Sequence, residues 1–170
     1  MTNSRQSFPV IMAFCLALAL CGCVESVQPS ASDVDEASSA AVREMTMDEY
    51  LQAMNPLIGQ MEICLEGSFE AAKSRKWSES HDRYSEAREL YQNIVDIEPP
   101  ESAVWTHELF KEYAESSRAA CQYYFKAVNE TKEGSLERAN EYLSTASNHA
   151  KKAAEWHEKA NEALKEAQPQ

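Results

Sequence analysis

The chain has little glycine, little proline and few basic residues. Only 4 Gly and 6 Pro occur among its 170 residues, so a turn-rich β-sandwich or barrel is not expected. Lys and Arg number 16 against 28 Asp and Glu, which gives a net charge of −12. This balance argues against nucleic acid or an anionic lipid surface as the main partner. The remaining composition, 44% hydrophobic and 26% charged, is that of a globular chain with room for one ordinary domain and appendages.

Residues 1–22 have the properties of a secretory signal peptide. A single Arg precedes an apolar run that ends at Leu20 and is too short to span a bilayer as a mature helix. The run closes with Leu20-Cys21-Gly22-Cys23, which resembles the lipobox of bacterial lipoproteins. The resemblance implies cleavage before Cys23 and a lipid anchor, with palmitate among its acyl chains, on that residue. An ordinary cleaved signal with an incidental cysteine is the alternative.

The lipobox resemblance also implies a location outside the cytoplasm, with acyl chains holding the protein to a membrane. Val24 after Cys23 resembles lipoproteins sent to the outer membrane of a two-membrane bacterium. In a one-membrane bacterium the protein would stay on the outer face of the cell membrane. Residues 23–44 are rich in Ser, Ala and acids without a helical apolar stripe, and we expect a flexible linker about 25 Å from end to end.

From residue 46 onward, apolar and small residues recur at spacings of three and four, the period of an α-helix. The pattern predicts an all-α domain over 45–168, an up-down-up-down antiparallel four-helix bundle. The helices are expected at about 46–75, 79–98, 101–131 and 135–167. Thr46 and Glu49 have the spacing of a capping box, and Gly134-Ser135 is typical of a helix end followed by a new cap.

Two positions could interrupt the first predicted helix. Pro56 should kink it, or restart it with Asn55 as the cap. Gly67 could end it earlier. However, the three-four pattern passes through Gly67 without slipping, so we favour a continuous helix.

The last two predicted helices allow a test of their pairing. If the chain folds back at about residue 132, Tyr124 faces Ala139 and Phe110 faces Ala153, large against small. The same arithmetic places His107 beside His157.

His107 and His157 are therefore the candidate ligand residues. They could form a two-histidine metal site that Glu108 or Glu158 completes. The alternative, which we favour, is a polar layer in which the histidines are hydrogen-bonded to Tyr91 and fix the helix register.

Other chemistry has little support in the sequence. The chain has no HExxH motif, no CxxCH motif and no Gly-rich phosphate loop. A haem held by Met47 or Met54 together with His157 is conceivable, but methionines at helical spacing are more often core filling. We expect no catalytic residues and no cofactor.

Two cysteines fall in the predicted domain, Cys64 and Cys121. An exported protein with two cysteines suggests a disulfide. With turns near residues 77 and 99, however, Cys64 lies level with about residue 108. That is roughly 20 Å from Cys121 along the bundle, well beyond the limit of about 7 Å between bridged Cα atoms. The sequence therefore predicts two buried free thiols.

Two further resemblances concern the domain. Residues 84–99 resemble the second helix of a tetratricopeptide repeat, but no 34-residue period follows, so we reject a solenoid. Residues 47–165 resemble a group of uncharacterised four-helix extracytoplasmic lipoproteins that share an ExPP-type break (Glu98-Pro99-Pro100), a following histidine (His107) and a glycine before the last helix (Gly134). This resemblance implies fold and location only.

We expect a non-catalytic structural or protein-interaction module of the cell envelope. Its partners would be the membrane, through the lipid anchor, and an envelope protein. The alternative is a small-ligand or metal-binding protein that uses the bundle interior.

Overall fold

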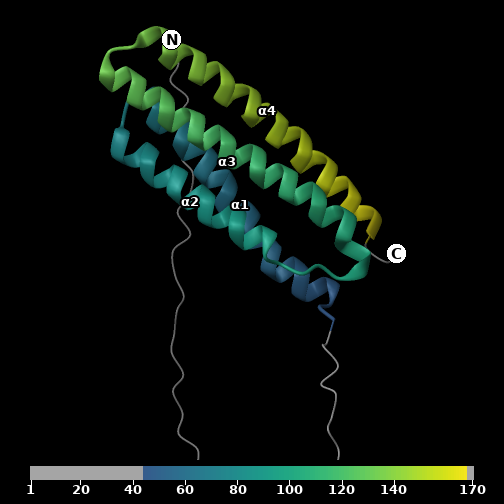
Figure 1. The fold of residues 1–170 in the computed structure, drawn as a ribbon. Coiled ribbons are helices and arrows are strands. Elements are labelled where there is room, and N and C mark those ends of the chain that lie inside the picture. Colours follow the sequence, from purple (N-terminus) through teal and green to yellow (C-terminus); the bar gives the residue numbers. More distant parts are fainter. Residues whose placement is uncertain (1–43, 168–170) are drawn as a thin grey trace, which may run out of the picture. The chain divides into compact units, whose positions relative to one another are not determined.

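The computed structural model in Figure 1 describes residues 44–167, which form four α-helices and contain no β-strand. The helices are α1 (Met47–Lys73), α2 (Trp77–Val95), α3 (Val104–Glu133) and α4 (Leu136–Ala167). A short 3₁₀ helix, η1 (Glu101–Ala103), precedes α3. The predicted all-α, up-down-up-down bundle is confirmed. The predicted signal peptide, Cys23 and all but the last residue of the predicted linker lie outside the described residues.

Local signals place the ends of α1 and α3. The Thr46 hydroxyl accepts a hydrogen bond from the Glu49 backbone N–H at 3.3 Å, and the Thr46 N–H donates to the Glu49 carboxylate at 2.9 Å. This is the expected capping box. At the end of α3, Gly134 adopts a left-handed φ of 86°, and the Ser135 N–H donates to the Glu130 carbonyl at 2.8 Å. The left-handed conformation is why glycine occupies this position.

Helix α1 is continuous through both positions that could have broken it. Pro56 lies inside α1, so the restart with Asn55 as a cap is wrong. Pro56 and Gln52, four residues earlier, are both exposed, and water can satisfy the Gln52 carbonyl that the proline leaves unbonded. Gly67 also lies inside α1, as expected, and a Cβ atom there would lie 2.7 Å from Nε of Arg83 on α2.

Helix α3 is the centre of the bundle. It packs against α1, α2 and α4, whereas α4 packs along α3 and touches η1. Figure 1 shows α4 on one side of α3 and the α1–α2 pair on the other. The buried residues of α4 are alanines at seven-residue intervals: Ala139, Ala146, Ala153 and Ala160. Such small side chains allow the axes of two helices to approach closely.

The hairpin of α3 and α4 closes near Gly134 and not at residue 132. Because α3 continues to Glu133, each residue of α3 faces a later residue of α4 than expected. His157 consequently lies against Tyr113, with ring centroids 4.9 Å apart. The expected pairing of His157 with His107 is wrong for this reason.

The connection between α2 and α3 changes the register more strongly. Pro100 has an extended backbone, with φ −63° and ψ 155°. The segment 96–100 therefore continues along the bundle before η1 turns the chain into α3 (Figure 1). Tyr91 on α2 faces Arg118, 5.6 Å from ring centroid to guanidinium carbon, about three helical turns further along α3 than a tight turn at residue 99 would give.

Candidate functional site

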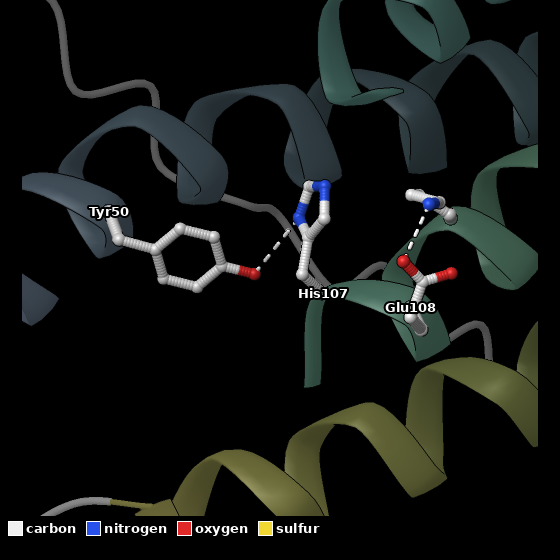
Figure 2. Close-up of polar contacts among 4 residues, drawn as sticks. Tyr50, His107 and Glu108 are labelled. Atoms are coloured by element: carbon white, nitrogen blue, oxygen red, sulfur yellow. Dashed lines mark hydrogen bonds and ion pairs between the residues drawn. The ribbon is translucent and has the colours of Figure 1, made fainter. Parts of the chain in front are cut away.

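His107, the first candidate ligand, lies at a buried contact between α3 and α1. Its Nδ1 is 3.3 Å from the hydroxyl of Tyr50, and the two rings meet edge to face (Figure 2). Burial lowers the pKa of His107, and the nearby Lys111 ammonium adds to this effect while Glu108 opposes it. Burial also raises the pKa of Tyr50. The pair is therefore neutral at pH 7, with the hydroxyl able to donate to an unprotonated Nδ1.

The expected layer of both histidines with Tyr91 is not formed, and His107 alone pairs with a different tyrosine. Tyr50 on α1, not Tyr91 on α2, is the partner of His107. Tyr91 contacts Arg118 because the extended connection before α3 moves α2 along the bundle.

His157, the second candidate ligand, connects α4 to α1 across α3. Its Nδ1 lies 3.2 Å from a carboxylate oxygen of Glu62 on α1. Its ring packs on Tyr113 and, at 6.5 Å, on Phe110. Within residues 44–167, no hydrogen bond, ion pair or ring contact joins His157 to His107.

The carboxylates expected to complete a metal site are elsewhere. Glu108 forms an ion pair with Lys111 at 2.6 Å on the same helix (Figure 2), and Glu158 is exposed. In the part of the chain that the structure describes, no three His, Cys, Asp or Glu side chains lie close enough to hold a metal ion. Met54 belongs to the buried core and Met47 packs against it, which is the core-filling role. The structure thus assembles no ligand set around the histidines.

A group of polar side chains fills the middle of the α1–α3 contact. We call it the central polar cluster: Cys64, Ser68, Tyr113, Ser117 and Cys121. All five residues are buried, Tyr113 almost completely and the others fully. The hydroxyls of Ser68, Tyr113 and Ser117 make no hydrogen bond of good geometry, but Ser117 lies close enough to lower the pKa of Tyr113, and Ser68 close enough to lower that of Cys121. The sequence predicted that Cys64 and Cys121 are buried, and the serines at core-facing helix positions are the signal for the rest of the cluster.

The two thiols of the cluster are free and buried, as predicted. The predicted separation of Cys64 from Cys121 along the bundle axis is wrong. Tyr50 of α1 meets His107 of α3, and further along Phe69 of α1 meets Tyr124 of α3 with ring centroids 5.7 Å apart. Cys64, between these two contacts, falls level with Cys121.

The electrostatic surroundings of the thiols agree with this register. Arg83 and Glu86 of α2 affect the pKa of both cysteines. Burial raises the pKa of Cys121 to about 11. The pKa of Cys64 is raised mainly by burial and, to a smaller extent, by the neighbouring Glu86. Both thiols are therefore protonated at neutral pH, which makes them poor nucleophiles in the closed bundle.

The outer surface of α1 carries exposed apolar side chains among acids. We call this the acidic apolar face: Ile63, Glu66, Phe69 and Glu70. Ile63 is 58% exposed and Phe69 is 46% exposed. The helical spacing of the four residues puts them on one side of α1, and all four are exposed.

The fold and these features define the class as an all-α four-helix bundle with a buried polar centre. Comparison of the chain with protein-family models, with curated proteins and with solved structures finds no match. None of the helices between residues 44 and 167 combines the length and the apolar character needed to span a bilayer.

Proposed function

We propose that the protein is a lipid-anchored extracytoplasmic lipoprotein whose helical bundle binds another protein of the cell envelope and catalyses no reaction. The anchor is supported by the apolar run that ends at Leu20 and by the Leu20-Cys21-Gly22-Cys23 signature. Cys23 would carry the lipid, and the Ser- and Ala-rich residues 24–44 would hold the bundle away from the headgroups.

The acidic apolar face is the observation that carries the binding proposal. Exposed Ile63 and Phe69 can be buried by a partner, and apolar area removed from water is the main favourable term in association. Glu66 and Glu70 flank them, with Glu70 in an exposed ion pair with Lys73 at 3.4 Å. The matching surface would present apolar side chains rimmed by Lys or Arg, which would compete with Lys73 for Glu70. The net charge of −12 favours a basic partner in the same way.

The test is capture of the partner by the acylated full chain in detergent-solubilised native envelope, with quantitative mass spectrometry. We expect a partner that the double variant I63S/F69S no longer enriches. L136S is the matched control, because Leu136 is 60% exposed at the start of α4 and lies outside the acidic apolar face.

Charge reversal separates lost binding from lost folding. E66K/E70K changes only exposed side chains, and we expect it to weaken capture while the helical circular dichroism signal is unchanged. Higher salt should weaken capture by the original chain, because it screens exposed charges. A partner enriched equally by the original chain, I63S/F69S and E66K/E70K would contradict this surface as the binding site.

A further inference from the structure

We propose that Cys64 and Cys121 are a reversible disulfide pair that covalently ties α1 to α3 in the folded bundle. The bond would close inside the central polar cluster, between two helices that already pack together. The proposal concerns the bundle alone and does not depend on the lipid anchor or on the acidic apolar face.

The register carries the first part of the argument. Contacts on either side of the cluster, Tyr50 with His107 and Phe69 with Tyr124, fix how α1 and α3 lie along each other. The first contact pairs residues 57 positions apart in sequence. The same offset pairs Cys64 with Cys121, so the two thiols have almost no separation along the helix axes.

The surroundings of the two thiols carry the second part. Cys121 acts electrostatically on Cys64, and Arg83 and Glu86 of α2 act on both thiols. Both cysteines are also fully buried, so they lie near each other inside the α1–α3 contact. A disulfide needs Cα atoms about 4.4–6.8 Å apart.

The hydroxyls of Ser68, Tyr113 and Ser117 distinguish this site from an ordinary apolar contact. Ser68 lowers the pKa of Cys121 and Ser117 lowers that of Tyr113, although burial outweighs both effects. The closed bundle covers both thiols, so an oxidant reaches them when α1 opens locally.

The chemistry is thiol–disulfide exchange with a small-molecule disulfide such as oxidised glutathione. One protein thiol, deprotonated in the opened state, attacks the glutathione disulfide; a mixed disulfide forms and one glutathione leaves as the thiolate. The second protein thiolate attacks the protein sulfur of the mixed disulfide and releases the second glutathione. The two protein thiols lose two electrons and two protons, which the oxidised glutathione takes up to become two molecules of reduced glutathione.

The test treats the folded full chain with oxidised glutathione, blocks free thiols and maps tryptic peptides by mass spectrometry. Trypsin releases Cys64 in peptide 44–73 and Cys121 in peptide 119–126, and the other three cysteines all precede residue 44. We expect peptides 44–73 and 119–126 joined, with the loss of two hydrogens, in most molecules. The bridge should raise the Tm by roughly 5–10 °C, because it closes a long loop in the unfolded chain. Reduction should reverse both effects.

Two variants serve as controls. C121S should show no joined peptide pair and no rise in Tm on oxidation. C121S/A114C keeps a thiol on the buried side of α3 but moves it about 10 Å along the axis, so it should not bridge to Cys64.

Several results would overturn the proposal. One is a folded chain in which Cys64 and Cys121 remain free thiols at every concentration of oxidised glutathione. Another is an equal yield of the bridge between Cys64 and A114C, which would show that unfolded chains supply the link. A Tm that falls on bridging would show that the native register does not accommodate the bond.

Discussion

The contact of His107 with Tyr50 joins α1 to α3 through two groups that are both buried and uncharged at neutral pH. A buried hydroxyl and a buried imidazole are stable together only while each satisfies the other. Apolar residues surround the pair in the core. The pair therefore favours one register of α1 on α3 over others that would leave both groups unbonded.

Removing the Tyr50 hydroxyl tests this contact. Y50F should lower the free energy of unfolding by about 1–2 kcal/mol, because His107 Nδ1 loses its partner while remaining buried. Y91F is the matched control and should change the free energy of unfolding by less than about 0.5 kcal/mol. Urea unfolding followed by circular dichroism measures both. Equal losses in the two variants would argue against a specific Tyr50–His107 bond.

Acid should also weaken the bundle through His107. Its pKa in the folded protein is below the ordinary value of 6.5, so the unfolded chain binds more protons below pH 6.5. The stabilising contribution of neutral His107 is complete above pH 6.5 and decreases as the pH falls through the lowered pKa. H107N should show a smaller loss between pH 7.5 and pH 5.5 than the original chain in urea unfolding. Identical pH dependence in the two chains would contradict a buried neutral imidazole.

At the scale of helices and their connections, the sequence predicts what is local. The periodicity identified four helices, and the capping box at Thr46 and the glycine at 134 placed two ends within a few residues. These signals depend on neighbours in the chain. The path of residues 96–103 has no such signal beyond its prolines. For that reason the sequence did not predict which tyrosine contacts His107, or which residue of α3 lies at the same height along the bundle as Cys64.

Two glycines should respond to alanine with opposite signs. G134A should destabilise the protein by about 1–2 kcal/mol, because φ at Gly134 is 86° and side chains with a Cβ disfavour this region. G59A should stabilise it by up to about 1 kcal/mol, because Gly59 is helical and a Cβ there meets nothing within 4 Å. Thermal and urea unfolding of both variants measure the difference. A G134A variant as stable as the original chain or more stable would mean that α3 does not end at Gly134 as described, and a destabilised G59A would contradict the open space at Gly59.

At the scale of the whole bundle, α4 packs on α3 far more than on α1, and the helical pattern of the sequence did not predict this asymmetry. A closed four-helix bundle would pack α4 on α1 as well as on α3. Here α4 lies along α3, and His157 of α4 lies 3.2 Å from a carboxylate oxygen of Glu62 on α1. The small residues at helical spacing in α4 predicted that one face of this helix is buried. They did not specify how many helices would cover that face. The acidic apolar face of α1 stays uncovered as a result.

The alanine contact of α4 gives a prediction for the assembled bundle. A153L should lower the free energy of unfolding by about 2 kcal/mol or more, because Ala153 is fully buried against α3 and a larger side chain overpacks the contact. A154L, at the neighbouring exposed position, should change it by less than about 0.5 kcal/mol. Urea unfolding distinguishes them. Equal effects would show that α4 does not rest on α3 through this row.

Helices α1 and α3 run parallel, and their register determines two features. It brings Tyr50 to His107, and it places Cys64 and Cys121 at the same height along the bundle. Nuclear Overhauser contacts between side-chain rings of the folded chain measure that register directly. We predict cross-peaks from Tyr50 to His107 and from Phe69 to Tyr124. Cross-peaks from Tyr91 to His107, with none from Tyr50, would contradict the account.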